Sequence, residues 1–224
     1  MKIGVFGKDA EKINYFQEEL RQKGFTLSET PEIVFSIGGD GSFLLSEHKF
    51  PGIPKLAVRD KDSLCRVCMV NNFDNALEAL YNKKFSVKEF PKIEAVIRGK
   101  KLIAANEIAI RNKELYHAIR FSLTAGSDYE LIGDGIVLAT AFGSTGYFYS
   151  ITKQSFDKGF GLAFNNTTTC MKPMYFNNPK VRIKILRNTA HISADNNPDI
   201  MEAPEGEVID LRGSDEVLRV IYPS

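Results

Sequence analysis

The feature that most restricts the fold is a change of pattern at Phe90-Pro91. Before this point, short apolar runs alternate with stretches of helical periodicity. After it, short strand-like runs follow one another with turns between them. The first pattern is typical of a parallel sheet covered by helices, and the second of antiparallel β structure. The sequence therefore predicts an α/β domain over residues 1–90 and a mainly antiparallel β domain over residues 91–214.

The expected elements are short in both domains. The run Ile33–Ile37 is almost continuously apolar, which is typical of a parallel strand buried on both faces. In the α/β domain we expect strands over residues 2–6, 33–37 and 55–58 and helices over 9–23, 43–49 and 72–83. In the β domain we expect strands over residues 93–97, 102–110, 118–125, 129–132, 135–141, 181–186, 190–194, 207–212 and 216–221, and one helix over 144–155.

The charge balance argues against a polyanionic partner. The 224 residues carry 29 basic and 28 acidic side chains, so the net charge of +1 gives no attraction to nucleic acid. With 43% hydrophobic and 25% charged residues, the composition is that of a folded protein. No apolar run approaches the ~20 residues of a membrane span, and the first residues do not form a signal peptide. We therefore expect a cytoplasmic protein without a nucleic-acid or membrane partner.

The cysteines do not indicate a metal site. Cys65, Cys68 and Cys170 are one ligand short of a structural zinc site, which takes four. Cys65 and Cys68 form a C-x-x-C inside a strand-like run, whereas a redox C-x-x-C opens a helix after a strand. The sequence favours small buried apolar side chains at these positions and no metal ligands.

The first candidate functional segment is Gly38-Gly39-Asp40-Gly41-Ser42, directly after the buried strand. Glycines let a ligand approach the backbone, and successive amides at the start of a helix suit phosphate oxygens. Asp40 would be the only charge among neutral donors, placed to take a proton from an attacking hydroxyl or to hold a metal through water. The alternative is a tight turn in which Asp40 caps the next helix, and the residues alone leave both interpretations open.

The second candidate is Asn106-Glu107, which interrupts the apolar run Leu102–Ile110. Adjacent strand residues point to opposite faces, so one polar side chain of the pair is expected to face inward. Such a side chain costs free energy unless it has a partner. An edge strand with Glu107 in solvent avoids that cost, and without further context it is the favoured interpretation.

The third candidate runs from Gly133 to Tyr147 and has the pattern of a strand, a turn of small residues and a helix. Ser144 or Thr145 is placed to cap that helix, whose amides could receive an anion. Asp134 lies in a Gly-Asp-Gly turn, which also fits a simple hairpin corner. Tyr147 fits either stacking on a flat ring or a place in the core. The segment is not a P-loop, because no Gly-Lys-Ser/Thr follows its glycines.

Taken together, the three segments resemble the NAD kinase family. Residues 38–42 resemble its GGDGT or GGDGS, Asn106-Glu107 its NE motif, and residues 134–147 its DG…STPTGSTAY segment, in the same order and with fitting spacing. GGDG alone also occurs in diacylglycerol and sphingosine kinase relatives and in phosphofructokinases, so the combination carries the resemblance. It implies a Rossmann-like α/β domain and a β-sandwich, with residues 215–224 packing back on the first domain.

The resemblance also implies a reaction. The γ-phosphoryl group of ATP, or of polyphosphate, passes to the 2′-hydroxyl of the adenosine ribose of NAD. Asp40 is the implied base for that hydroxyl, and Mg²⁺ bridges the donor phosphates mainly through substrate oxygens and water. The implied phosphate-path and nucleotide-binding residues are Gly39, Gly41, Ser42, Asn106, Glu107, Asp134 (near the nicotinamide), Ser144, Thr145 and Tyr147 (the last two on the adenine side). By analogy the family also implies a homo-oligomer, a dimer or a tetramer.

The chain departs from the family's pattern in several places. Residues 56–67 lack the asparagine, the glycines and the phenylalanine found there in the family, and that phenylalanine contributes to the adenine pocket. Ala139, Ala141, Phe142 and Gly146 differ from the third motif, and Asp195-Asn196 stands in the place of a later Asp-Gly. Two alternatives therefore stay open: a lipid or other small-molecule kinase with the GGDG motif, and a non-catalytic NAD(P)-binding regulator.

Overall fold

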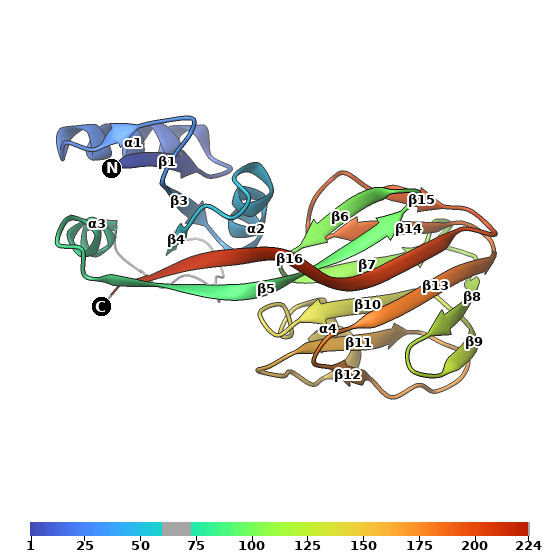
Figure 1. Ribbon diagram of the computed structural model, residues 1–224. Coiled ribbons are helices and arrows are strands. Elements are labelled where there is room, and N and C mark those ends of the chain that lie inside the picture. Colours follow the sequence, from blue (N-terminus) through green and yellow to red (C-terminus); the bar gives the residue numbers. More distant parts are fainter. Residues whose placement is uncertain (60–72, 224) are drawn as a thin grey trace. The chain divides into compact units, whose positions relative to one another are not determined.

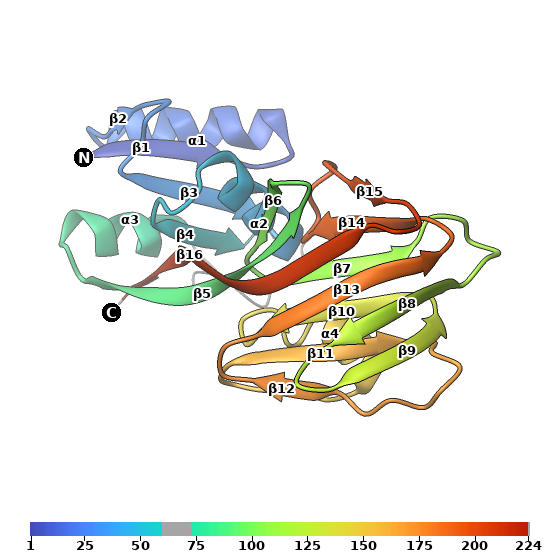
Figure 2. The ribbon, with the colours of Figure 1, turned by 45° about the vertical axis from the view of Figure 1, so that its right-hand side comes forward.

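The computed structural model describes residues 1–59 and 73–223 (Figure 1). The chain forms two compact units: unit 1 consists of Met1–Phe90 and Val217–Ser224, and unit 2 of Pro91–Glu216. Two long strands, β5 (Phe85–Ile97) and β16 (Val208–Pro223), carry the chain out of unit 1 and back into it. These strands are paired and lie side by side in Figures 1 and 2. The predicted fold class, α/β followed by β, is confirmed.

Unit 1 is built on a parallel sheet, as predicted. The strand order is β2-β1-β3-β4-β16, with β16 joining through Val220 opposite Lys55. All the pairs from β2 to β4 are parallel. The four N-terminal strands are β1 (Lys2–Phe6), β2 (Thr26–Leu27), β3 (Ile33–Gly38) and β4 (Lys55–Arg59).

Three helices cover this sheet: α1 (Ala10–Gln22), α2 (Asp40–Lys49) and α3 (Phe73–Tyr81). Asp9 begins α1, because its carboxylate accepts hydrogen bonds from the amides of Glu11 and Lys12. The rings of Phe16 in α1 and Phe73 in α3 lie 4.4 Å apart, centroid to centroid. Helices α1 and α3 therefore share one apolar cluster with the buried residues of β1, β3 and β4.

A buried ion pair fixes the end of α2. Lys55 and Glu47 are 0% and 3% exposed, and the ammonium of Lys55 pairs with the carboxylate of Glu47. Lys55 Nζ also donates to the carbonyls of Phe50 and Ile53, at 2.7 and 2.8 Å, and Glu47 Oε1 accepts from the amide of Gly52. Because each charge is paired and further hydrogen-bonded, the pair is tolerated in the interior and ties α2 to β4.

Unit 2 is a sandwich of two antiparallel sheets. In the first, the order is β16-β13-β8-β9, and β5 pairs with β16 and with β6. In the second, the order is β12-β11-β10-β7-β14-β15. The bounds are β6 (Lys100–Ala104), β7 (Glu107–Asn112), β8 (Ile119–Thr124), β9 (Asp128–Gly133), β10 (Gly135–Thr140), β11 (Phe160–Asn165), β12 (Met174–Phe176), β13 (Lys180–Arg187), β14 (Ala190–Ala194) and β15 (Met201–Ala203).

The core of unit 2 draws on both sheets. Phe121 and Ile183 from the first and Ile110 and Leu162 from the second are at most 1% exposed and belong to one cluster. A smaller cluster lies under helix α4 (Tyr147–Thr152), where Phe148 packs on the opposite face of the second sheet. This arrangement explains why apolar residues are frequent at successive positions of the second sheet: both of its faces are covered.

Several predicted elements need correction. The run Leu102–Ile110 is two strands, because the chain leaves β6 in the first sheet and enters β7 in the second. The helix predicted over 144–155 is confined to α4, since residues 141–146 form hydrogen-bonded turns around two glycines. The strands predicted over 207–212 and 216–221 are the single strand β16, which stays extended through the polar residues between them. Strands β2, β11, β12 and β15 were not predicted.

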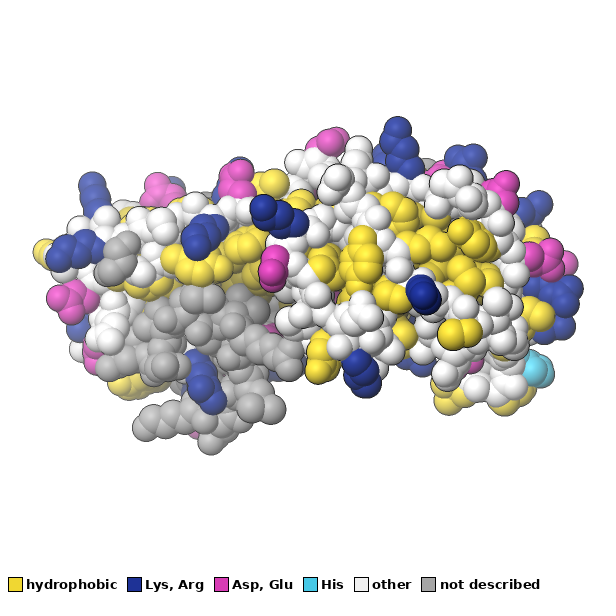
Figure 3. Space-filling model, turned by 90° about the horizontal axis from the view of Figure 1, so that it is seen from below, with side chains coloured by type: hydrophobic (Ala, Val, Ile, Leu, Met, Phe, Trp, Pro, Cys, Tyr) yellow, Lys and Arg dark blue, Asp and Glu magenta, His cyan; other side chains and the backbone are white. Residues whose placement is uncertain are grey.

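The surface carries both signs of charge. In Figure 3, both basic and acidic side chains are visible on the face that is seen. In the part of the chain that the structure describes, no helix is long and apolar enough to cross a membrane. Cys170 is exposed, which corrects the expectation of a buried side chain. Cys65, Cys68 and most of the divergent segment 56–67 lie outside the described residues.

Candidate active site

The glycine turn of unit 1 has its predicted place at the carboxyl end of β3. Gly38 has φ = +131°, a conformation that L side chains rarely adopt, and a Cβ built on it would lie 2.6 Å from Ser42 Oγ. The amides of Ser42 and Phe43 both donate to the carbonyl of Gly39. The turn is thus closed by its own residues, and Gly38 cannot be replaced without strain.

Asp40 is the first residue of α2 and does not cap it. The N-cap is Gly39, which has no side chain to cap the helix. The cap interpretation of Asp40 is therefore wrong. A carboxylate in the first turn of a helix is stabilised by the helix dipole. Gly41 follows in the same turn, and Ser42 is buried, with 6% of its surface exposed.

A hollow of about 120 Å³ lies beside this turn within unit 1. Gly38 and Ser42 line it together with Gly7, Lys8 and Lys12, which come from the end of β1 and the start of α1. Lys8 is exposed, and Lys12 lies 3.9 Å from the carboxylate of Asp9. The sequence reasoning missed both lysines. The rule that parallel strands present their carboxyl ends at one edge could have found them, since β1 ends at Phe6.

In unit 2, Asn106 lies in the turn between β6 and β7, and Glu107 is the first residue of β7 at the end of that turn. Strand β7 lies between β10 and β14, so the edge-strand interpretation of Glu107 is wrong. Asn106 Oδ1 and Glu107 Oε2 are both buried, and neither has a hydrogen-bond partner among the residues that the structure describes. A buried polar atom left unpaired costs ~1–3 kcal/mol, so a pair of them on one turn calls for an explanation.

The charge state of Glu107 is shifted by its surroundings. Burial, which has the larger effect, and the negative charge of Asp195 together raise the pKa of the Glu107 carboxyl to about 8. At neutral pH this carboxyl is therefore mainly protonated and able to donate a hydrogen bond. Perturbed carboxyls of this kind are concentrated at functional sites.

The turn is framed by residues from distant parts of the chain. Thr140, at the end of β10, donates from its hydroxyl to the carbonyl of Ala105 at 2.6 Å and from its amide to the carbonyl of Asn106 at 2.8 Å. Gly143 lies against the same turn, since a Cβ built on it would be 2.5 Å from the Cα of Asn106. Asp195, after β14, accepts hydrogen bonds from the amides of residues 105–107. Sequence reasoning placed Gly143 in a possible anion loop and missed this packing role.

Ser144 and Thr145 do not cap α4. The N-cap is Gly146, again without a side-chain hydrogen bond, so that expectation is wrong. Ser144 is buried and donates from its hydroxyl to the carbonyl of Phe156 at 2.9 Å. Thr145 is exposed. Gly146 lies close to the Asn106-Glu107 turn, because a Cβ built on it would be 3.5 Å from Glu107 Oε2 and 4.0 Å from Asn106 Nδ2.

Asp134 lies at the other end of β10. The strand has six residues, which separates Asp134 from Thr140 by ~20 Å at ~3.3 Å per residue. Asp134 Oδ2 accepts a hydrogen bond from Asn166 Nδ2 at 2.9 Å. The hydroxyl of Tyr147 reaches this end as well, since it meets the side chain of Asn165, and the guanidinium of Arg111 lies over the Tyr147 ring. Unit 2 thus brings Asn106, Glu107 and Gly146 together and holds Asp134 apart from them.

The described residues contain no group of three or more His, Cys, Asp or Glu side chains that could hold a metal ion. Any cation at Asp40 would therefore take most of its ligands from bound phosphates and water, which is the usual situation for Mg²⁺.

Comparison with known proteins gives several relatives, although no family model matches the chain. The NAD kinase of Sulfurisphaera tokodaii is 33% identical over 164 residues, which are 68% of this chain and 63% of the relative. The NAD kinase of Saccharophagus degradans is 24% identical over 217 residues, 89% of this chain and 74% of the relative. The chain thus spans less than two thirds of the length of the first of these relatives.

Two solved structures share the fold. An NAD kinase from Archaeoglobus fulgidus, in complex with ATP, superposes with a TM-score of 0.80 at 21% identity and covers 98% of this chain and 93% of that one. Yeast NADH kinase, complexed with NADH, gives a TM-score of 0.82 at 14% identity and covers 100% and 84%. Together with the sequence relatives and the three motifs, these matches show that the chain is similar to NAD kinases in sequence and shares their fold.

Proposed function

We propose that this protein is an NAD kinase. It transfers the γ-phosphoryl group of ATP, or the terminal phosphoryl group of polyphosphate, to the 2′-hydroxyl of the adenosine ribose of NAD. The relatives named NAD kinase and the fold shared with an ATP-bound NAD kinase support this proposal. NAD and ATP are accordingly the proposed small-molecule partners.

The observation that carries the proposal is the pair of unpaired polar atoms on the Asn106-Glu107 turn. Asn106 Oδ1 can accept a hydrogen bond, and the largely protonated carboxyl of Glu107 can donate one. A ribose presents hydroxyls that both donate and accept, so it satisfies both atoms at once. Binding a sugar here therefore removes the cost of leaving them buried and unpaired.

The extent of the site in unit 2 agrees with a dinucleotide. Asp134 lies at the far end of β10 from the Asn106-Glu107 turn, a separation of ~20 Å, and the hydroxyl of Tyr147, which follows Gly146 beside the turn, contacts Asn165 toward that end. An extended dinucleotide has two nucleosides joined through a pyrophosphate, and it can contact both ends of such a surface. Asp134 remains the proposed contact for the nicotinamide end. Thr145, whose side chain is exposed, is a proposed nucleoside contact.

In unit 1 we assign the chemistry to Asp40. Its carboxylate takes the proton of the 2′-hydroxyl while the ribose oxygen forms a bond to the γ-phosphorus and the bond to the leaving phosphate oxygen breaks. The glycine turn supplies amides without side-chain bulk, and Lys8, beside it in a hollow that Lys12 and Asp9 also line, is the proposed positive charge for the donor's phosphates. Positioning and charge neutralisation supply most of the remaining rate enhancement.

Mg²⁺ is the proposed cofactor, and the residues present fit it. Asp40 offers one carboxylate beside a turn of backbone amides, which suits a cation held mainly by substrate phosphates and water. When bound, the ion would neutralise charge on the transferred phosphoryl group. A cytoplasmic location and a homo-oligomeric state, dimer or tetramer, belong to the same proposal.

A coupled assay tests the function. Purified protein is mixed with NAD and Mg²⁺, with ATP in one tube and polyphosphate in another, and NADP is measured with an NADP-specific dehydrogenase. We expect NADP from the wild type and a ~10²–10⁴-fold lower rate from Asp40→Asn, with NADP binding retained, because only the proton acceptor is lost.

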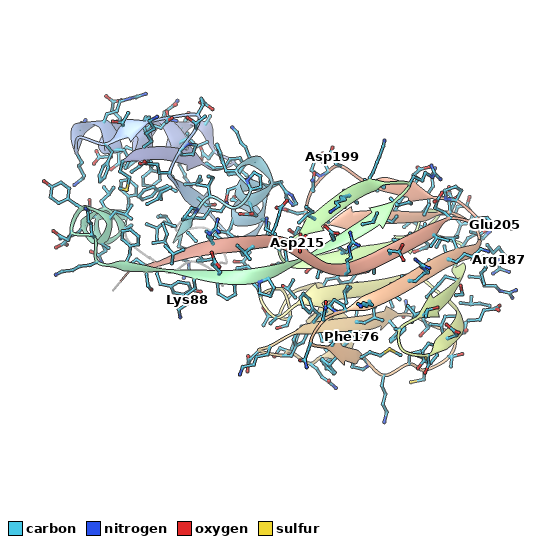
Figure 4. The ribbon with its side chains drawn as sticks, viewed as in Figure 1. Lys88, Phe176, Arg187, Asp199, Glu205 and Asp215 are labelled. Atoms are coloured by element: carbon cyan, nitrogen blue, oxygen red, sulfur yellow. The ribbon has the colours of Figure 1, made fainter. Side chains whose placement is uncertain are left out.

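The matched control is Asp215→Asn, an exposed aspartate on β16 labelled in Figure 4, which should leave the rate unchanged. No NADP with either donor at high substrate concentration would overturn the proposal. NADP binding without turnover would instead favour the non-catalytic regulator, and turnover of a diacylglycerol or a sphingoid base would favour a lipid kinase.

A further inference from the structure

We propose that Asp195 is a positioning residue, which holds the turn of residues 105–107 in the shape that presents Asn106 and Glu107 to the nucleotide. The assignment of the nucleotide rests on the proposed function, whereas the hold on the turn does not. Asp195 follows strand β14 and lies about 90 positions after the residues that it contacts.

The carboxylate of Asp195 accepts three backbone hydrogen bonds from this turn. Oδ2 of Asp195 accepts from the amide of Ala105 at 2.9 Å. Oδ1 accepts from the amides of Asn106 and Glu107, at 2.7 and 3.0 Å. Hydrogen bonds to an ionised acceptor are roughly twice as strong as neutral ones, so three of them fix three successive residues. In the return direction, the amide of Asp195 donates to the carbonyl of Glu107 at 2.9 Å.

The backbone of Asp195 has an unusual conformation. Its φ is +51°, in the left-handed region that most side chains avoid and that Asp and Asn tolerate best. This conformation turns the chain at the end of β14 while the carboxylate contacts three amides of one turn. A strained conformation persists only where its surroundings hold it, and such residues are concentrated at functional sites.

Two polar side-chain atoms of the turn have no hydrogen-bond partner among the described residues. Its backbone is held by Asp195 on one side and by Thr140 on the other, yet Asn106 Oδ1 and Glu107 Oε2 stay buried without partners among the described residues. A turn is preorganised for a ligand when its backbone is fixed and its polar side-chain atoms are left for the ligand to pair with. The turn of residues 105–107 meets both conditions. Asp195 therefore acts through Asn106 and Glu107 and not by touching substrate.

Asp195 also acts on Glu107 through its charge. Glu107 lies on β7, with Gly146 beside its carboxyl and the end of β14 on the other side, and the charge that acts on it from these elements is that of Asp195. Removing this charge lowers the pKa of the Glu107 carboxyl, since burial alone then remains. A merely structural role for Asp195 would not move the titration of Glu107 in this way.

The test compares Asp195→Asn with Asp199→Asn. Asn keeps the size and the tolerance for positive φ, but its amide nitrogen cannot accept a hydrogen bond and its charge is gone. Asp199 is exposed in the loop that follows β14 and is labelled in Figure 4, so its substitution removes the same charge from the same loop. For Asp195→Asn we expect KM for NAD to rise at least tenfold, kcat to change less than threefold, and the amides of residues 105–107 to exchange at least tenfold faster.

We further expect the titration of Glu107, followed by NMR of its carboxyl carbon, to move to lower pH in Asp195→Asn, while Asp199→Asn matches the wild type in every measurement. The proposal would be overturned if Asp195→Asn kept the wild-type exchange rates of amides 105–107 and the wild-type titration of Glu107. If Asp195→Asn does not fold, the exchange of the wild-type protein decides: amides of residues 105–107 as unprotected as a free loop would overturn it. A wild type that forms no NADP refutes the proposed function, and the exchange and titration results still test Asp195.

Discussion

The two candidate turns of this protein are built in opposite ways. The glycine turn of unit 1 contains hydrogen bonds from the amides of Ser42 and Phe43 to the carbonyl of Gly39, and its shape depends on the positive φ of Gly38. The turn of residues 105–107 in unit 2 contains no glycine. It is held by Thr140, which lies 35 positions from Ala105, and by Asp195, which lies 90 positions from it.

The difference indicates which substitutions disrupt each turn. A turn whose shape depends on the positive φ of its own glycine is disrupted by changes within it. A turn specified from a distance is disrupted by residues that never meet the ligand. The following predictions test this contrast, from the largest expected effect to the smallest.

The largest effect is expected from Gly143→Ala. A methyl group at this position would lie 2.5 Å from both the Cα and the carbonyl oxygen of Asn106, so backbone must move on one side or the other. We expect a loss of ~3 kcal/mol in the free energy of unfolding, at the upper end for overpacked sites, and a weakened affinity for NADP. Urea unfolding and calorimetric titration with NADP measure the two quantities.

Gly146→Ala is the matched control for Gly143→Ala. Its methyl group would lie 3.2 Å from the carbonyl of Gly143 and 3.5 Å from Glu107 Oε2, which are contacts that small shifts relieve. We expect less than ~1 kcal/mol of destabilisation. Equal effects of the two substitutions would show that Gly143 has no special part in the frame of the turn.

An intermediate effect is expected from Gly38→Ala. The positive φ and the contact with Ser42 Oγ should together cost ~1–3 kcal/mol of stability. The double variant Gly38→Ala/Ser42→Ala removes the contact with Oγ but keeps the strained φ and the 3.1 Å approach to the Cβ of residue 42, so it should recover only part of the loss. Full recovery in the double variant would mean that the close contact, and not the backbone conformation, is what requires glycine.

The smallest effect, counted per unit of pH, is a dependence of stability on pH. Between the ordinary pKa of 4.5 and about 8, the unfolded chain has lost the proton of Glu107 and the folded protein keeps it. Stability should therefore fall as pH rises through this window, by at most ~1.4 kcal/mol per pH unit. Glu107→Gln should remove this part of the slope, as urea unfolding at pH 5 and pH 8 would show. Parallel slopes for the wild type and Glu107→Gln would contradict the raised pKa.

The same contrast decides how much could be predicted from the sequence. The glycine turn, the strand before it and helix α1 depend on neighbouring residues, and the pattern predicts them to within a few positions. The change of sheet at Ala105-Asn106 could not be predicted, because both strands are buried and the apolar run continues across the break. Nor could the contacts of Thr140, Gly143 and Asp195 with that turn, since they depend on which strands become neighbours.

Some errors have a common cause in local reasoning. Asp40, Ser144 and Thr145 are residue types that often cap helices, but glycines occupy both N-cap positions. Glu107 was favoured as an exposed edge residue because a buried carboxyl is rare. It is buried here with a neutralised carboxyl, which only its surroundings reveal.

The path of β16 has a consequence for the order in which the protein is made. Val220 and Ile221 are 0% exposed, and Val220 lies opposite Lys55 at the edge of β4. Residues 91–216 are synthesised before the C-terminal residues that complete unit 1. The nascent α/β unit must therefore wait, with the edge of β4 uncovered, for the whole β unit to be synthesised. A chain arrested before residue 217 would leave unit 2 whole and unit 1 without its last strand.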